Sequence, residues 1–540
     1  MGWRAFAGRV FGKQAALVLF LLCALPLTIF TALITPPSQS PDEVAHYART
    51  LGLLRGVLLS DKHQMTDPLT GKPEWLTTIS VDAGLLSGSF GAVTLTGPGQ
   101  RPVETQQDWN TIETLPQNHA LLAVNLPNTA TYFPAAYLPA FMGVVLAKYG
   151  FNETPLHCFL TARIFMALSY VAAGLGALAV AAYGEGLLLT VLLLPMPLFL
   201  GGTLNQDGLL TAMTCLACAF LTRNTRAARL AGLVVFAIVL GAKPPYVLLM
   251  GAFALPLFAP GFWRRFADMM LVMLPVAAWT VIIALFVVVA YGKVQYHPGP
   301  LYAGDHSVMM DHANAGLQWQ ILAQRPRRFL ALPYYSTLQF AYADLISLIG
   351  VLGPLQLQLG HGYYMWWSFA LVCAMLGVLV TRRPEILPPR VAGVNFVAVM
   401  AAIGVTYWLL NIIFYLDWTN VGLPYIEGIQ GRYLLIFIPF LHHRAINGRA
   451  IAAHRHIHHP RAKVAGNLLA AVGRAIIANQ HLARNTAAAQ IILRLGNAAR
   501  QGFRLVQAGH HNRQFTIHQT LRRGWGKANA GNNSKPVSAE

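Results

Sequence analysis

QAALVLFLLCALPLTIFTALI, at residues 14–34, is an uncharged apolar run, and the polar stretch TPPSQSPDEVAHYART follows it directly at residues 35–50. A helix needs roughly 20 apolar residues to cross about 30 Å of hydrocarbon. Arg4, Arg9 and Lys13 precede the run as in a secretory signal, but no A-x-A-like cleavage site follows. We therefore expect a retained first membrane helix with a cytoplasmic N-terminus, from which residues 35–50 emerge on the external side.

The composition is that of an integral membrane protein. Of the 540 residues, 55% are hydrophobic and 11% are charged, and the mean hydropathy is +0.48. Soluble domains typically have about 25% charged residues. We predict an all-α fold, a polytopic transmembrane helix bundle of about ten helices with a long first external loop. The apolar runs lie near residues 14–34, 132–149, 160–182, 185–203, 208–222, 229–242, 245–259, 268–291, 363–381 and 391–416.

The order of these runs predicts the topology. Basic clusters such as RNTRAAR at residues 223–229 are expected to face the cytoplasm. Only an even number of crossings returns the chain to the external side before residue 205. One of the three apolar stretches between residues 132 and 203 is therefore expected to be interfacial or re-entrant.

The formal charge of +19 arises mostly from the C-terminal tail. Residues 442–540 contain fifteen Lys and Arg residues and one acidic residue, so the membrane part is only mildly basic and nucleic-acid binding is not indicated. The tail is interpreted either as a cytoplasmic basic segment attracted to anionic lipid or as the product of a shifted reading frame. The second interpretation is favoured, because the apolar run YLLIFIPFL ends at Leu441 after nine residues, too few to span a bilayer. The expected organisation is a first helix at 1–34, an external loop at 35–131, a multispanning bundle at 132–441 and the tail at 442–540.

Polar residues at the external ends of the predicted helices need an explanation, because charges near a bilayer are usually functional or kept at the water boundary. We expect them to converge on one outward-facing crevice. Carboxylates there can act as bases or cation ligands, and Arg and Lys can bind phosphate. The candidate residues are Asp42, Glu43, His46, Arg49, Asn205, Asp207, Lys243, Tyr246, Trp418, Gln430 and Arg432.

Each candidate also has a structural alternative. Asp42 and Glu43 are placed to cap a helix that begins near residue 44, and Asp207 is placed to cap a helix that begins at Gly208. Lys243 precedes two prolines and is placed to snorkel at a helix break, and interfacial Trp and Tyr residues are commonly membrane anchors. Glu43, His46 and Arg49 are spaced by three residues, so they can also form a helix-surface network.

The motifs PPSQSPDEVAHYART, NQDGLL, KPPYVLL and DWTNVGLPYIEGIQGRYLLIFIPF resemble, in order and spacing, those of the bacterial membrane family called domain of unknown function 2142. The resemblance runs from about residue 14 to residue 441 and ends at His442. This family is similar to the GT-C glycosyltransferases, multispanning enzymes that use polyprenyl-phosphate sugars and have a carboxylate motif in the first external loop. For this chain we expect a location in the bacterial cytoplasmic membrane. The resemblance implies Asp42 as the catalytic carboxylate, with Glu43 as the alternative, and Lys243 and Arg432 as phosphate ligands.

The leading hypothesis is a glycosyltransferase that moves a sugar from a polyprenyl-phosphate donor to a cell-envelope glycan or glycolipid. The alternatives are a transporter or flippase of a lipid-linked glycan and a non-catalytic assembly subunit. Mg or Mn between Asp42 and Asp207 is an open possibility. Zinc is not expected, because the pair Cys215 and Cys218 lacks a second ligand pair and lies in an apolar run.

Overall fold

The computed structural model describes residues 12–66, 73–89, 110, 113, 119–126, 129–223, 225–288, 314–380 and 389–443. The expected tail at 442–540 lies outside these residues except for its first two. The described part of the chain is mostly helical, with several apolar helices, which is consistent with a helical membrane protein.

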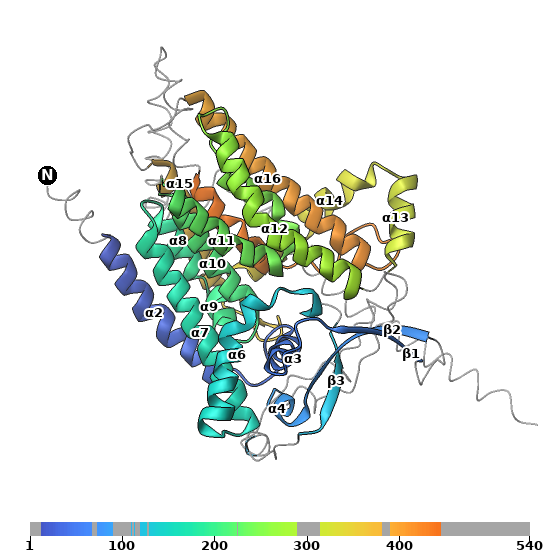
Figure 1. The fold of residues 1–540 in the computed structure, drawn as a ribbon. Coiled ribbons are helices and arrows are strands. Elements are labelled where there is room, and N and C mark those ends of the chain that lie inside the picture. Colours follow the sequence, from blue (N-terminus) through green and yellow to red (C-terminus); the bar gives the residue numbers. More distant parts are fainter. Residues whose placement is uncertain are drawn as a thin grey trace, which may run out of the picture. The chain divides into compact units, whose positions relative to one another are not determined.

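The α-helices are labelled in Figure 1. They are α2 (Lys13–Ile34), α3 (Glu43–Leu54), α4 (Ala83–Ser87), α6 (Leu138–Val145), α7 (Pro155–Val180), α8 (Glu185–Leu192), α9 (Pro195–Gly201), α10 (Gln206–Leu221), α11 (Arg226–Ala242), α12 (Phe262–Phe286), α13 (Ala315–Gln324), α14 (Arg328–Gly350), α15 (His361–Val380) and α16 (Pro389–Asp417). Tighter 3₁₀ turns are η2 (Thr129–Thr131), η3 (Pro134–Tyr137), η5 (Pro244–Phe253), η7 (Gly431–Ile436) and η8 (Ile438–His443), and the π-helical turn η4 covers Leu146–Phe151.

Four helices in the described part are long and apolar enough to cross a membrane: α2, α7, α12 and, from Gly393, α16. A fifth is reached if α9 and α10 count as one span bent by 115°. The prediction of about ten spans is not confirmed. Prolines explain much of the difference, because a proline in a helix interior removes a hydrogen bond and clashes with the preceding turn. Pro134 begins η3 inside the predicted run 132–149, and Pro195 begins α9 inside the predicted run 185–203.

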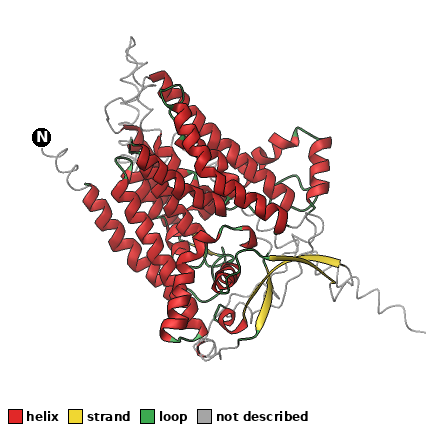
Figure 2. Ribbon diagram, in the orientation of Figure 1, coloured by secondary structure: helices red, strands yellow, loops and turns green. Residues whose placement is uncertain are grey.

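The segment 35–131, predicted to be external, is not purely helical in its described part, which corrects the all-α prediction there. Strands β1 (Asp61–Thr66), β2 (Pro73–Asp82) and β3 (Leu121–Asn125) form an antiparallel sheet in the order β1-β2-β3 (Figure 2). A second sheet pairs β4 (Val351–Leu352) with β5 (Leu357–Gln358). In β2, Ile79 and Val81 are buried while Ser80 between them is exposed, the alternation of a strand with one covered face.

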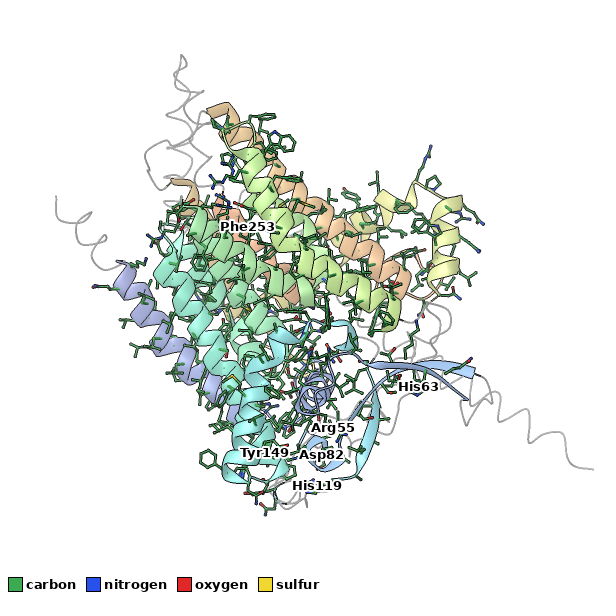
Figure 3. All side chains as sticks on the ribbon, in the orientation of Figure 1. Arg55, His63, Asp82, His119, Tyr149 and Phe253 are labelled. Atoms are coloured by element: carbon green, nitrogen blue, oxygen red, sulfur yellow. The ribbon has the colours of Figure 1, made fainter. Side chains whose placement is uncertain are left out.

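Helix α3 packs on this sheet. A side chain on Gly52 of α3 would lie 2.6 Å from Cγ2 of Ile79, so only glycine permits this approach. Asp82, labelled in Figure 3, ends strand β2. It accepts hydrogen bonds from the Leu85 amide at 3.0 Å and from Lys148 at 3.3 Å. Helix α3 therefore packs directly on β2, and Asp82 joins the end of the sheet to α4 and η4.

Helix α10 lies at the centre of the packing that positions the site. It contacts α7, α9 and α11, and α7 in turn lies along α2 (Figure 1). Most α10 residues from Gln206 to Ala219 are buried. The N-terminus of α10 carries the NQDG motif and lies beside the turn that leads into α3, because hydrogen bonds join the two.

Candidate functional site

Four charged side chains from distant parts of the sequence form one cluster: Asp42, Asp207, Lys243 and Arg432. Nη2 of Arg432 donates to Oδ2 of Asp42 at 3.0 Å across 390 residues of sequence. Nζ of Lys243 lies 3.0 Å from Oδ1 of Asp207, and Nε of Arg432 lies 3.7 Å from its Oδ2. The expected convergence of these four residues is therefore present in the structure. We call them the four-charge cluster.

Burial is uneven across the four-charge cluster. The side chain of Arg432 is 3% exposed, that of Asp207 9% and that of Lys243 16%, whereas Asp42 is 56% exposed. Asp42 is thus the member that faces solvent, and the two cations lie behind it. The formal charges of the four groups cancel, as expected for charges removed from water.

The turn that carries Asp42 is held against the N-terminus of α10. Ser40 donates to Thr203 at 3.0 Å, and the Asn205 amide donates to the Pro41 carbonyl at 2.8 Å. Asp42 itself adopts a left-handed conformation with φ of 58°, which is unfavourable for a residue other than glycine. The surrounding bonds hold this conformation and direct the carboxylate towards Arg432.

The capping alternatives are resolved by these contacts. Asp42 occupies the N-cap position of α3, yet its side chain makes no capping hydrogen bond. Asn205, not Asp207, caps α10, because its Oδ1 accepts from the Asp207 amide at 2.8 Å. Neither Asp42 nor Asp207 caps a helix with its side chain. Asn205 caps α10 and also holds the turn that carries Asp42, through its bond to the Pro41 carbonyl.

Glu43 lies apart from the four-charge cluster. Its two carboxylate oxygens accept from Nε and Nη2 of Arg163 at 2.8 and 2.6 Å, and Oε1 also accepts from the Leu204 amide. Both side chains of the pair are 0% exposed. Arg163 also donates to the carbonyls of Ala32, Thr35 and Pro36 at the end of α2. Because both oxygens of Glu43 are occupied, it is not placed to act as the alternative base, and it anchors the turn instead.

His46 and Arg49 extend the site along α3. Nδ1 of His46 lies 2.8 Å from the Tyr137 hydroxyl, and its ring stacks on Tyr132 at a centroid distance of 6.2 Å. Burial lowers the pKa of His46 to about 4, so the ring is neutral at pH 7. Arg49 is fully buried and donates to the Leu58 carbonyl at 2.7 Å. The predicted helix-surface network is absent here, since both residues face the interior.

Tyrosines enclose the cations of the four-charge cluster. Nζ of Lys243 lies 4.8 Å from the ring centroid of Tyr433 and 5.9 Å from that of Tyr132, within the range of cation–π attraction. Tyr246 is buried, and its hydroxyl donates to the Tyr433 carbonyl at 2.7 Å. Tyr246 therefore supports the segment that carries Tyr433 and Arg432.

Trp418 and Gln430 lie in the segment around Tyr433. Gly428, with φ of 86°, lies against the Trp418 ring, where a side chain would overlap it. Trp418 packs beside Phe414, whose ring lies 5.5 Å from that of Tyr433. Gln430 precedes η7, and its buried Oε1 has no hydrogen-bond partner in the described structure. The side-chain oxygen of Gln430 is therefore an acceptor without a hydrogen bond, on the residue directly before Gly431.

Arg163, Tyr132 and Tyr137 were not predicted as part of this region. Arg163 is the one charged residue in the apolar run 160–182, and a lone charge in such a run is the signal that would have identified it. Tyr132 and Tyr137 belong to the motif TYFPAAY at 131–137, where an aromatic cluster at a helix start was counted only as apolar.

The residues present do not fit the suggested Mg or Mn site. Asp42 and Asp207 are each paired with a cationic side chain, and within the described ranges no group of three His, Cys, Asp or Glu residues could hold a metal. We derive no step through a metal. The five cysteines are free thiols, and Cys215 and Cys218 are buried in α10.

Comparison with known proteins identifies the family. No curated protein and no solved structure matches the chain. One family model, described as "Predicted membrane protein (DUF2142)", matches residues 25–441 and so covers the turn with Asp42, the N-terminus of α10 and the segment with Arg432. The chain therefore belongs to the DUF2142 family of membrane proteins.

Proposed function

We propose that this protein is a glycosyltransferase of the bacterial cytoplasmic membrane. It transfers a sugar from a polyprenyl-phosphate donor to a cell-envelope glycan or glycolipid at the external face, with its N-terminus in the cytoplasm. The observation that carries the proposal is the contact between the exposed carboxylate of Asp42 and the buried guanidinium of Arg432, with Lys243 close by. A base and an anion-binding pair thereby meet at one solvent-facing point.

The cations are suited to a phosphate. Nε and Nη1 of Arg432 have no hydrogen-bond partner in the part of the chain that the structure describes. Buried donors without partners are unfavourable, and they are satisfied when an anion binds. Nη2 also donates to the Tyr433 hydroxyl at 3.3 Å. If Asp42 leaves Nη2, one N–H of Nη2 becomes available beside Nη1 for bidentate binding of a phosphate. Lys243 then adds a second positive charge.

The same exchange prepares the base. When a donor phosphate replaces the Asp42 carboxylate on Arg432, the carboxylate is released at the solvent-facing side, where an acceptor hydroxyl can approach. Asp42 takes the hydroxyl proton as the acceptor oxygen forms a bond to the anomeric carbon. The bond between that carbon and the phosphate oxygen breaks, and the electron pair leaves with the phosphate, whose added charge Arg432 and Lys243 stabilise.

The other residues have supporting roles in this scheme. Asp207 holds Lys243 at 3.0 Å and keeps the buried charges balanced. The half-buried rings of Tyr132 and Tyr433 flank Lys243 and offer faces on which a sugar can pack. Asn205 holds the backbone of Pro41, which sets the position of the Asp42 carboxylate.

Substitution of Asp42 tests the proposal. In the full-length protein, reconstituted with a panel of polyprenyl-phosphate sugars and membrane extract as acceptor, Asp42→Asn should lower transfer by at least about a hundredfold, the scale of lost acid–base catalysis. Membrane insertion and binding of polyprenyl phosphate should persist. Asp61→Asn is the matched control, because Asp61 is an 80% exposed carboxylate of the same external segment. Transfer by Asp42→Asn at the wild-type rate would refute the catalytic role.

A transporter of a lipid-linked glycan is the second candidate, and one observation favours it. The break of 115° between α9 and α10 resembles the discontinuous helices of transporters, whose N-termini face anionic substrate groups. Asn205 and Asp207 lie at this break beside the cations. Reconstituted protein that moves a fluorescent polyprenyl phosphate across liposomes without sugar transfer would favour transport. An assembly subunit instead predicts that substitutions in the four-charge cluster have no effect.

A further inference from the structure

Arg49 has no role in the mechanism above, although it is one of the largest fully buried side chains. Its Nη2 donates to the Leu58 carbonyl at 2.7 Å and makes a long contact of 3.5 Å to the Tyr132 carbonyl. Its Nε and Nη1 have no hydrogen-bond partner. Among the described residues, no carboxylate forms an ion pair with it.

Comparison with Arg163 shows why this is unusual. Arg163 is equally buried, but its Nε, Nη1 and Nη2 all donate, to Glu43 and to three backbone carbonyls. A guanidinium that only stabilises the fold is expected to be satisfied in this way. Arg49 resembles Arg432 in one respect, because Nε and Nη1 of both residues lack a hydrogen-bond partner, although Arg432 is ion-paired with Asp42 and Asp207.

Arg49 is linked to the four-charge cluster through Tyr132. The Tyr132 carbonyl accepts from Arg49, while its ring stacks on His46 and lies 5.9 Å from Nζ of Lys243. His46, one turn before Arg49 on α3, contacts the Tyr137 hydroxyl at 2.8 Å. The Arg49 guanidinium and the Lys243 ammonium are therefore separated by the neutral rings of His46 and Tyr132. This arrangement matches a ligand with two anionic groups.

We propose that Arg49 is a second anion-binding residue of the same site and takes a second anionic oxygen group of the ligand. This inference rests on the proposed function, because Arg432 and Lys243 hold the first phosphate. The second group is either the other phosphate of a polyprenyl diphosphate or the carboxylate of an acidic sugar, since both offer the oxygen acceptors that a guanidinium prefers. Because Arg49 is buried, its packing must open, which predicts slower association for the doubly anionic ligand.

Binding measurements on the full-length protein in nanodiscs test the inference. The probes are a polyprenyl monophosphate, a polyprenyl diphosphate, and polyprenyl phosphates that carry either glucose or glucuronate. We expect the diphosphate, or the glucuronate lipid relative to the glucose lipid, to bind at least about tenfold more tightly, the scale of one charge-assisted hydrogen bond. Tighter binding of the diphosphate identifies the second anionic group as a phosphate. Tighter binding of the glucuronate lipid identifies it as the carboxylate of an acidic sugar.

Variants then assign the preference to Arg49. Arg49→Lys, which keeps the charge but removes the two unpartnered donors, should abolish the preference while monophosphate binding stays at the wild-type level. Arg55→Lys is the matched control, because Arg55 follows α3, is exposed and is labelled beside it in Figure 3. Arg55→Lys should retain the preference.

Equal affinity of the wild-type protein for all four lipids overturns the role of Arg49, and this comparison needs no variant to fold. Retention of the preference in Arg49→Lys overturns it as well. Either result leaves the proposed transferase intact if monophosphate still binds and transfer still depends on Asp42. If the wild-type protein does not bind polyprenyl monophosphate, the proposed function itself is refuted.

Discussion

Replacement of Glu43 by glutamine separates two neighbouring carboxylates that the sequence alone does not distinguish. Glu43 accepts from Arg163 through both oxygens, at 2.8 and 2.6 Å, and neither side chain is exposed. Glutamine has nearly the same shape but no charge, and its amide nitrogen cannot accept from Arg163. The substitution therefore leaves the Arg163 guanidinium buried without a counter-ion.

The size of the effect follows from this burial. Removing one partner of a buried ion pair costs about 3–5 kcal/mol. The carbonyls of Ala32, Thr35 and Pro36 still accept from Arg163 in the variant, so we expect the lower end, about 3 kcal/mol. Since about 1.4 kcal/mol is a tenfold change, the ratio of folded to unfolded protein should fall by more than about a hundredfold.

Steric trapping in bicelles measures the free energy of unfolding of a membrane protein, and sugar transfer per folded molecule is measured in parallel. Asp42→Asn is the matched control, because Asp42 is 56% exposed and Asp207 remains beside Arg432 as its counter-ion, so a loss of only about 1 kcal/mol is expected. Glu43→Gln should lose stability and keep its activity per folded molecule, and Asp42→Asn should show the reverse. In the double variant Glu43→Gln/Arg163→Gln, the loss should be well short of the sum of the two single losses.

The reasoning is wrong if Glu43→Gln is as stable as Asp42→Asn, or if it loses transfer while its stability is unchanged. The first result would mean that the Arg163 pair does not hold the turn. The second would return Glu43 to the catalytic role that the family resemblance allowed.

Three further predictions follow from the contacts around the site. Asn205→Ala removes the cap of α10 and the bond to Pro41, so the free energy of unfolding should fall by about 1–2 kcal/mol and transfer should fall with it, as measured by steric trapping and the transfer assay. His46 binds a proton less readily when folded, because burial lowers its pKa to about 4, so the unfolded state takes up the proton first as pH falls. Stability should therefore decrease by about 3 kcal/mol between about pH 6.5 and pH 4, and His46→Gln should lack this part of the pH dependence. In Gly431→Ala the added methyl group would overlap the Asp344 carbonyl, so α14 must shift; we expect a loss of about 1–3 kcal/mol and weaker binding of polyprenyl phosphate in nanodiscs.

Each of these has a clear contrary outcome. Asn314→Ala is the control for the cap, because Asn314 caps α13 by accepting from the Leu317 amide at 3.0 Å without contacting the site. Equal loss of transfer in both cap variants would show that the bond to Pro41 is unimportant. An unchanged pH profile in His46→Gln, or wild-type lipid binding in Gly431→Ala, would contradict the other two predictions.

The sequence was sufficient for features that depend on local hydropathy and charge. The membrane class follows from the composition, and spans near α2, α7, α12 and α16 coincide with predicted apolar runs. The sequence also predicted the convergence of Asp42, Asp207, Lys243 and Arg432. A bilayer restricts polar side chains to helix ends, so the prediction needed only the side of the membrane on which each helix end lies. The number of spans was overestimated, since hydropathy does not register where a proline or a sharp bend divides a run.

Only the tertiary structure decided what each polar residue does. Asp42 and Glu43 are adjacent and chemically alike, yet one pairs with Arg432 at the surface and the other with Arg163 in the interior. Their partners lie 390 and 120 residues away, so no local pattern separates them. The unsatisfied state of Arg49 is likewise invisible in a sequence, because it depends on the acceptors that the fold fails to bring to it. Hydropathy is a property of residues that are neighbours in the sequence. Hydrogen bonds and ion pairs instead require atoms to meet within about 3 Å, and these distances are fixed only when the whole bundle is packed.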